Sequence, residues 1–302
     1  MVLEQYKTLK FKVIDTLLLL MAALPPVACI ALKVLFTPAG EGISIAGALV
    51  FFTISMPLQD LPITESQVNS LAVMISIFAL CLYFTHGLSV KCKLKRQVIA
   101  ELIVEKANSL TINNMGEYFK GFAPFIAAIM GLSAFSSLIA LLGLYAPTSD
   151  INIVGGWAIL VFILITYYKN KCGPIHYLKS FCDPVLLAPL NIISEVATPI
   201  SMAFRHYGNV LSGAVISVLI GTALRGLTNT LLGWLPGFLG KFPFLQIGLP
   251  AILSIYFDVF SGLLQAFIFA MLTMLYVSGG FPAEDYAARK LAREAKKNKN
   301  EI

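Results

Sequence analysis

A line of mostly polar side chains runs through an otherwise apolar segment at residues 185–223. Its members follow one another at steps of three or four: Glu195, Thr198, Met202, Arg205, Asn209 and Ser212. Side chains at this spacing share one face of a helix. Arginine stays protonated in proteins, whereas a buried lysine readily loses its proton. This first polar line therefore predicts a permanent positive charge within a buried or membrane-spanning helix.

A second polar line lies in the next apolar segment and consists of Ser254, Asp258, Ser261 and Gln265, again at steps of three or four. Two antiparallel helices would bring both lines together, or bring them to a shared water path. Ionisable groups inside a membrane mark an ion or substrate pathway by default. The alternative is an ion pair between Arg205 and Asp258 that only joins the helices. Glu195 lies about 15 Å along the axis from Arg205, too far for a direct bond within one helix.

The composition identifies the kind of protein that must hold these lines. The chain has 302 residues, of which 58% are hydrophobic and 13% are charged. Soluble domains have roughly 45–50% apolar and about 25% charged residues. The net charge of +6 comes from short basic clusters between apolar segments, which is typical of topology signals and not of a nucleic-acid-binding face. We therefore predict an all-α, polytopic membrane protein that does not bind nucleic acid.

Six segments are long and apolar enough to cross a membrane, which takes about 20 residues. They cover residues 13–35, 68–88, 123–144, 151–168, 185–223 and 247–277. The last two exceed one upright crossing, so we expect tilt or kinks, with Pro184, Pro189 and Pro199 as kink points.

Basic residues predict the orientation of these segments. They cluster before the first span, after the second, after the fourth, and in the tail, at Lys7, Lys10, Lys12, Lys91, Lys93, Lys95, Arg96, Lys169, Lys171, Lys179, Arg289, Lys290, Arg293, Lys296, Lys297 and Lys299. The intervening loops 37–67 and 146–150 contain no Lys or Arg, and Arg225 and Lys241 are weak exceptions near the third outer loop. With six crossings, the positive-inside rule predicts that both termini are cytoplasmic.

The stretch between the second and third spans, residues 96–122, mixes charged and apolar residues. We expect an amphipathic helix in the cytoplasmic interface, with a solvated connector as the alternative. The five cysteines and three histidines are scattered, and we expect no disulfide framework, metal site or cofactor from them. An intramembrane enzyme would need a nucleophile with a base, or a metal cluster, and neither HExxH nor a paired Cys–His occurs.

Four stretches resemble subunit a of the F-type ATP synthase family. ISMAFRHYGNVLSG contains an Arg-x-x-Gly-Asn signature, and LLQAFIFAMLTMLYVS is similar to the last helix of that family. LLAPLNIISEVATPIS and APTSDINI fit as well, and all four stretches occur in the family's order. The resemblance covers about residues 62–279. Residues 1–65 are less familiar and look like an N-terminal extension, ahead of a subunit a-like membrane domain at 66–302.

The resemblance implies an ion-conducting stator subunit of a rotary ATP synthase in the bacterial plasma membrane, without nucleotide site or cofactor. Arg205 matches the stator arginine that faces the carboxylates of the c-subunit ring, and Asn209 matches an asparagine one turn later. Glu195 matches a carboxylate of the cytoplasmic-side path, and Gln265 matches a glutamine facing the arginine. The path would also contain Thr198, Ser212, Ser254, Asp258 and Ser261. Implied partners are the c-ring, peripheral stalk b subunits, other ATP synthase subunits, the lipid bilayer and the transported H⁺ or Na⁺.

Three positions depart from the family pattern. Ala214 stands where many bacterial members have Glu, Asp258 where they often have His, and His206 where Leu is usual. We expect Asp258 to have taken over the role of the missing outer carboxylate, and we interpret His206, which lies off the first polar line, as an interface residue. The rival function is a secondary transporter with a midplane site. Such folds often contain inverted repeats, and the first half of the chain shows no counterpart of the Arg205 segment.

Overall fold

The computed structural model describes residues 2–37, 47–57, 59–88, 95–174, 177, 185–232, 244–282 and 286. Six helical segments in it are long and apolar enough to span a membrane: Phe11–Phe36, Glu65–Thr85, Glu117–Leu142, Ile151–Lys169, Ala188–Leu231 and Gly248–Gly279. The predicted all-α, polytopic class is therefore confirmed. Some predicted kink and topology signals lie outside the described residues, namely Lys91, Lys93, Lys179, Pro184, Lys241 and the tail from Arg289 to Lys299.

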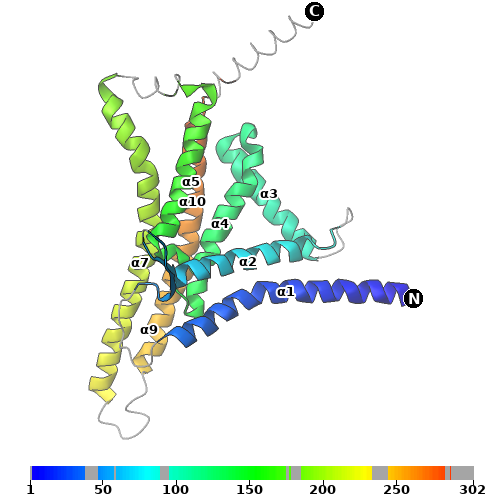
Figure 1. The fold of residues 1–302 in the computed structure, drawn as a ribbon, viewed down its shortest axis with the longest axis vertical. Coiled ribbons are helices and arrows are strands. Elements are labelled where there is room, and N and C mark those ends of the chain that lie inside the picture. Colours follow the sequence, from blue (N-terminus) through cyan, green and yellow to red (C-terminus); the bar gives the residue numbers. More distant parts are fainter. Residues whose placement is uncertain are drawn as a thin grey trace, which may run out of the picture.

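Helices α1 (Val2–Phe36) and α2 (Glu65–Thr85) pack along each other and run crosswise to the other long helices (Figure 1). Between them, β1 (Val50–Ile54) and β2 (Leu61–Thr64) form a short antiparallel hairpin. This β-hairpin was not predicted from the sequence and occupies part of the loop expected at 37–67. It leads directly into α2, since β2 ends at Thr64 and α2 begins at Glu65. Glu65 also donates its backbone N–H to the Leu49 carbonyl, just before β1.

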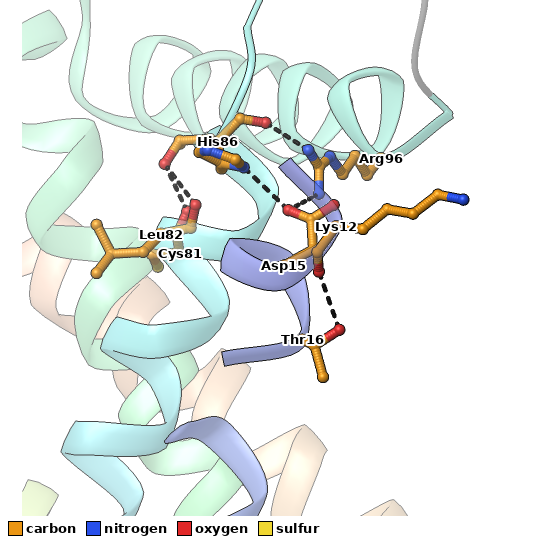
Figure 2. Close-up of polar contacts among 8 residues, drawn as sticks. Lys12, Asp15, Thr16, Cys81, Leu82, His86 and Arg96 are labelled. Carbon is orange, nitrogen blue, oxygen red and sulfur yellow. Dashed lines mark hydrogen bonds and ion pairs between the residues drawn. The ribbon is translucent and has the colours of Figure 1, made fainter. Parts of the chain in front are cut away.

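Ion pairs attach α1 to its neighbours at two places along its length. Near its N-terminal half, Asp15 Oδ1 lies 2.7 Å from Arg96 Nη1 and 2.9 Å from His86 Nδ1 (Figure 2). Arg96 also donates to the His86 carbonyl at 2.7 Å. Near the other end, Lys33 Nζ lies 3.0 Å from the buried carboxylate of Glu65. The first helix is thus bound to the rest of the chain by charge as well as by apolar packing.

Helix α3 (Lys95–Met115) occupies most of the stretch expected to form an amphipathic helix. It buries Ala107, Thr111 and Met115 at steps of four and packs against α4 (Ala123–Leu138) and α10 (Gly262–Gly279). Its other faces carry charged residues and also expose large apolar side chains, namely Val98, Ile99, Leu102, Ile103 and Val104. The helix is confirmed, and its place in the membrane interface stays a prediction, which this exposed apolar surface supports.

The turn between the third and fourth spans contains APTSDINI and serves as a local anchor. After η1 (Glu117–Phe122) and α4, the 3₁₀ turns η2 (Ile139–Leu142) and η3 (Pro147–Ser149) lead into α5 (Ile151–Lys169), which η4 (Asn170–Cys172) follows. Asp150 accepts a hydrogen bond from Asn152 N at 3.0 Å and one from the Ser66 hydroxyl at 2.5 Å. The motif therefore caps α5 and ties it to the start of α2.

The C-terminal half forms a long helix hairpin. After the 3₁₀ turn η5 (Val185–Leu187), α7 (Ala188–Leu232) has 45 residues, which corresponds to about 67 Å at ~1.5 Å per residue. This is roughly twice the thickness of a bilayer core, so the helix must be strongly tilted if it lies in the membrane. It runs beside α9 (Phe244–Ser254), the π-helical turn η6 (Ile255–Ser261) and α10 (Figure 1).

The main core lies where α4, α5, α7 and α10 meet. Its most buried side chains include Ile126, Val161, Met202, Phe269 and Met274. Many large apolar side chains on the outer faces of the helices remain exposed, as lipid-facing helices require. The core holds α7 and α10 together, and these helices carry the two polar lines.

Candidate functional site

The two polar lines meet at one pair of side chains. The Ser261 hydroxyl donates a 2.8 Å hydrogen bond to Asn209 Oδ1, and Asn209 Nδ2 lies 3.5 Å from the Ser261 carbonyl oxygen. Asn209 comes from α7 and Ser261 ends the π-helical turn η6, so this contact crosses the hairpin. At this point the structure brings the lines together as the sequence predicts.

Arg205 lies one helical turn before Asn209 and is exposed on α7. Within the described part of the chain, no hydrogen bond or ion pair includes its guanidinium. The half-buried Asp258 instead hydrogen-bonds to the Ser254 hydroxyl on its own helix. The alternative of a static Arg205–Asp258 pair therefore has no support, and no carboxylate among the described residues pairs with this cation.

Gln265 occupies a different environment. It lies on α10 with 5% of its surface exposed, and no hydrogen bond joins it to Arg205 among the described residues. The expectation that Gln265 faces the arginine across the hairpin stays a prediction. His206, next to Arg205, is fully buried against Trp157 and Phe269, and its Nε2 lies 3.2 Å from the Ser133 hydroxyl. It thus lies at a contact between helices.

The π-helical turn changes the geometry of the second polar line. Steps of three and four residues presuppose a regular α-helix, whereas Ile255–Ser261 forms the wider π-helix. Such turns are rare and frequently occur at functional sites. On the facing helix, a Cβ atom added to Gly213 would lie 2.9 Å from Phe257, so the absence of a side chain at 213 permits this close approach. Residues 213 and 257 are therefore direct neighbours across the hairpin.

Two members of the first polar line are partly engaged by their own helix. The Thr198 hydroxyl donates to the Ser194 carbonyl at 2.8 Å, and the Ser212 hydroxyl donates to the Asn209 carbonyl at 3.0 Å. Such bonds within a helix are common for Ser and Thr. Each hydroxyl oxygen still has acceptor capacity for a water or an ion.

Glu195 lies in a polar pocket of about 450 Å³ between α5, α7 and α10. We call it the inner pocket; its lining includes Lys169, Asn191, Ser194, Glu195, Thr198 and Tyr276. Lys169 Nζ lies 2.5 Å from Glu195 Oε2, and the Tyr177 hydroxyl lies 3.4 Å from Oε1. Burial, and then the negative charge of Glu195, raises the pKa of Tyr177, so this phenol stays protonated at neutral pH. The contact between Lys169 and Glu195 was not predicted from the sequence, because a lysine at the end of a membrane helix indicates only the topology.

Comparison with known proteins decides the family. The model of the ATP synthase A chain family matches residues 68–278, more than two thirds of the chain, and contains both polar lines. The chain belongs to this family. The match begins within α2, so α1 and the β-hairpin precede it.

Relatives in the ATP synthase A chain family agree with this match. ATP synthase subunit a of Legionella pneumophila is 27% identical over 242 residues, covering 79% of this chain and 95% of the relative. ATP synthase subunit a 1 of Pelobacter propionicus is 30% identical over 233 residues, covering 74% and 91%. ATP synthase subunit a of Desulforamulus reducens is 31% identical over 201 residues, covering 64% and 70%. The resemblance found in the sequence motifs is thereby confirmed, and the chain is a multi-pass membrane protein of ion transport and ATP synthesis.

Proposed function

We propose that this chain is the ion-conducting stator subunit of a rotary ATP synthase, with Arg205 as its fixed charge. The observation that carries the proposal is the exposed guanidinium of Arg205 on α7, which no described carboxylate neutralises. An unpaired cation inside a membrane is expensive unless a partner compensates for it. A neighbouring subunit that carries carboxylates past α7 would do so, and a ring of c subunits has the required form.

The physical basis of coupling follows from electrostatics. Near a permanent cation a carboxylate is held ionised, because an opposite charge lowers its pKa. The same carboxylate must be neutral to face lipid, so it has to bind an ion before it leaves the cation. A fixed arginine between two water-filled half-paths therefore forces each ion to travel with the ring. It also repels cations that would leak directly from one half-path to the other.

Each polar line contributes to one half-path in this proposal. The inner pocket around Glu195 supports an inner half-path, and Asp258, Ser254 and Ser261 supply the outer one. The transported ion is H⁺ or Na⁺. Both termini would be cytoplasmic, and the partners would be the c-ring, peripheral stalk b subunits and other ATP synthase subunits. Residues 1–65 would be an extension that adds α1 beside α2.

The decisive experiment replaces Arg205 in the whole complex. Arg205→Ala should abolish ATP-driven ion transport in inverted membrane vesicles while the complex still assembles. Arg205→Lys should be severely impaired, since a buried lysine can lose its charge. Arg225→Ala is the matched control, because Arg225 is also exposed on α7 but lies 13 residues after Ser212, where the first polar line ends. At ~1.5 Å per residue this is about 20 Å along the helix. Near-normal coupled transport in either Arg205 variant would refute the proposal.

Copurification separates this function from that of a secondary transporter. A stator subunit should copurify with an oligomeric ring, whereas a transporter should be isolated alone or as a dimer of itself. Isolation of this chain without a ring, from membranes that contain an intact ATP synthase, would favour the transporter.

A further inference from the structure

The Lys169–Glu195 pair is a feature of the inner pocket that the proposed function does not use. Lys169 ends α5 and Glu195 lies on the first turns of α7, so the pair joins two different helices. With an N–O distance of 2.5 Å, the ammonium occupies one carboxylate oxygen directly. The side chains are 25% and 13% exposed, so water reaches the pair but does not surround it. Glu195 is thus already compensated by a cation of this chain.

Gly280 provides the space for this contact. It follows α10, and a Cβ atom added there would lie 2.6 Å from Lys169 Cε and 2.8 Å from its Cγ. Any side chain at 280 would therefore push the lysine stem aside. The neighbouring Gly279 has no atom within 4 Å of an added Cβ. Of these two glycines, only Gly280 fits closely against the stem of the lysine whose ammonium contacts Glu195.

Other polar groups complete the surroundings of Glu195. Among the described residues, the titratable side chains around it are Lys169 on α5, Tyr177 after α5 and Tyr276 on α10. The amide of Asn191 and the hydroxyls of Ser194 and Thr198 line the pocket from α7 itself. These neutral oxygens could ligate a hydrated cation or hold water for proton transfer. Lys169 is the one lysine or arginine side chain in this described set.

We propose that Lys169 is a tethered counter-cation of Glu195, which an ion entering from the inner side must displace. The inference rests on the proposed function, in which Glu195 belongs to the inner half-path. Lys169 then acts as a positioning residue: it holds the carboxylate at the pocket wall and competes with H⁺ or Na⁺ for it. When the ion arrives, the ammonium leaves the carboxylate and moves towards water. Lys169 therefore determines the ion concentration at which the inner path is half-loaded.

Inverted membrane vesicles containing the whole complex test this directly. ATP hydrolysis there draws ions from the bath through the inner side, so the transport rate can be measured over a series of pH values and Na⁺ concentrations. Lys169→Met keeps the apolar stem but removes the competitor. The half-saturating ion concentration should fall by about two- to fivefold, the range for partly exposed ion pairs. Lys169→Arg keeps the cation and should stay near the wild-type value.

Two glycine variants test the same contact without removing a charge. Gly280→Ala should displace the lysine stem and lower the half-saturating concentration in the same direction as Lys169→Met, and Gly279→Ala should not. Lys171→Met is a further control, because Lys171 lies over the rings of Tyr167 and Tyr168 rather than on a carboxylate. If the complex with Lys169→Met fails to assemble, the comparison of Gly280→Ala with Gly279→Ala tests the inference instead.

An unchanged half-saturating concentration in Lys169→Met, or in Gly280→Ala where the lysine variant does not assemble, would overturn the inference. So would a Lys169→Arg variant that behaves like Lys169→Met. Failure of this inference is distinguishable from failure of the proposed function. If Arg205→Ala abolishes transport while the Lys169 variants load normally, only the tethered counter-cation is refuted. If Arg205→Ala transports normally, the stator function itself fails.

Discussion

Ser261 and Asn209 join the two long helices of the hairpin through a 2.8 Å hydrogen bond between their side chains. The bond connects the end of a π-helical turn with the residue one turn after the exposed Arg205. It therefore helps to fix the position of Arg205 along the axis of the hairpin, relative to the second polar line. A contact that sets this position should affect transport even though neither side chain carries charge.

Ser261→Ala should slow ATP-driven transport severalfold and destabilise the hairpin by about 1 kcal/mol, because the half-buried Asn209 amide loses a donor. Transport in vesicles and thermal unfolding of the purified complex measure the two effects. Thr222→Ala is the matched control: its hydroxyl lies on the exposed surface of α7 and donates only to the Val218 carbonyl of the same helix. Equal behaviour of the two variants would show that the Ser261–Asn209 bond has no special role.

Features carried by local sequence were predictable. Long apolar runs gave six spans, because about 20 apolar residues in lipid have no alternative to a helix. Steps of three and four placed Asn209 and Ser261 on facing lines. The excess length predicted for the last two segments agrees with the 45 residues of α7 and the 32-residue apolar segment Gly248–Gly279.

Features that depend on distant residues were not predictable. The π-helical turn shows no local signal in IYFDVFS, and the Phe257 within it contacts Gly213, which lies 44 positions earlier in the chain. The Lys169–Glu195 pair joins residues 26 positions apart, and no sequence pattern in either segment indicates that the two side chains meet. The β-hairpin at 50–64 depends on pairing between two strands of one loop. The charge pattern predicts only that this loop lies on the outer side of the membrane.

The attachment of α1 gives a second prediction. Asp15→Asn removes the carboxylate that Arg96 and His86 share, and Arg96 is only 10% exposed (Figure 2). The loss should destabilise the chain by about 1–2 kcal/mol, because a partly buried guanidinium is left without its counter-charge. A fall of a few degrees in the Tm of the detergent-solubilised protein would measure it.

Lys12→Gln is the control for the α1 attachment, since Lys12 is an exposed cation three residues earlier on the same helix. It should leave the Tm unchanged. If Asp15→Asn and Arg96→Gln both leave the Tm unchanged as well, α1 is held by apolar packing alone.

The proposed orientation is tested by labelling single cysteines on a Cys-free background. Cysteines at Ser44 and Asp60 should react with a membrane-impermeant reagent from outside, and those at Asn170, Lys171 and Lys296 only from inside. Asp60 and Asn170 are exposed in the structure, whereas Ser44 and Lys296 lie outside the described residues. Labelling of Lys296→Cys from the outer side of intact cells would contradict the cytoplasmic placement of the C-terminus.

Asp258 and Ala214 provide the last prediction. Because Gly213 contacts Phe257 across the antiparallel hairpin, Ala214 and Asp258 each lie one residue beyond this contact, in opposite directions. At ~1.5 Å per residue they differ in level by only about 3 Å. A carboxylate at either position could then serve the same outer water path. Asp258→Asn should leave an assembled complex whose transport is slower by up to about 100-fold, the lower end of what positioned proton-transfer groups contribute.

Adding Ala214→Glu to Asp258→Asn should restore part of the rate, because the negative charge returns to nearly the same level from the other helix. The exposed Ala214 leaves room for the longer side chain. Ala223→Glu in the same background is the matched control: it adds an exposed carboxylate to α7 nine residues further on and should restore nothing. A purely structural role for Asp258 predicts loss of assembly instead. Wild-type rates for Asp258→Asn over a pH and Na⁺ series would remove Asp258 from the path, since a carboxylate that concentrates or relays cations cannot be neutralised without a change in rate.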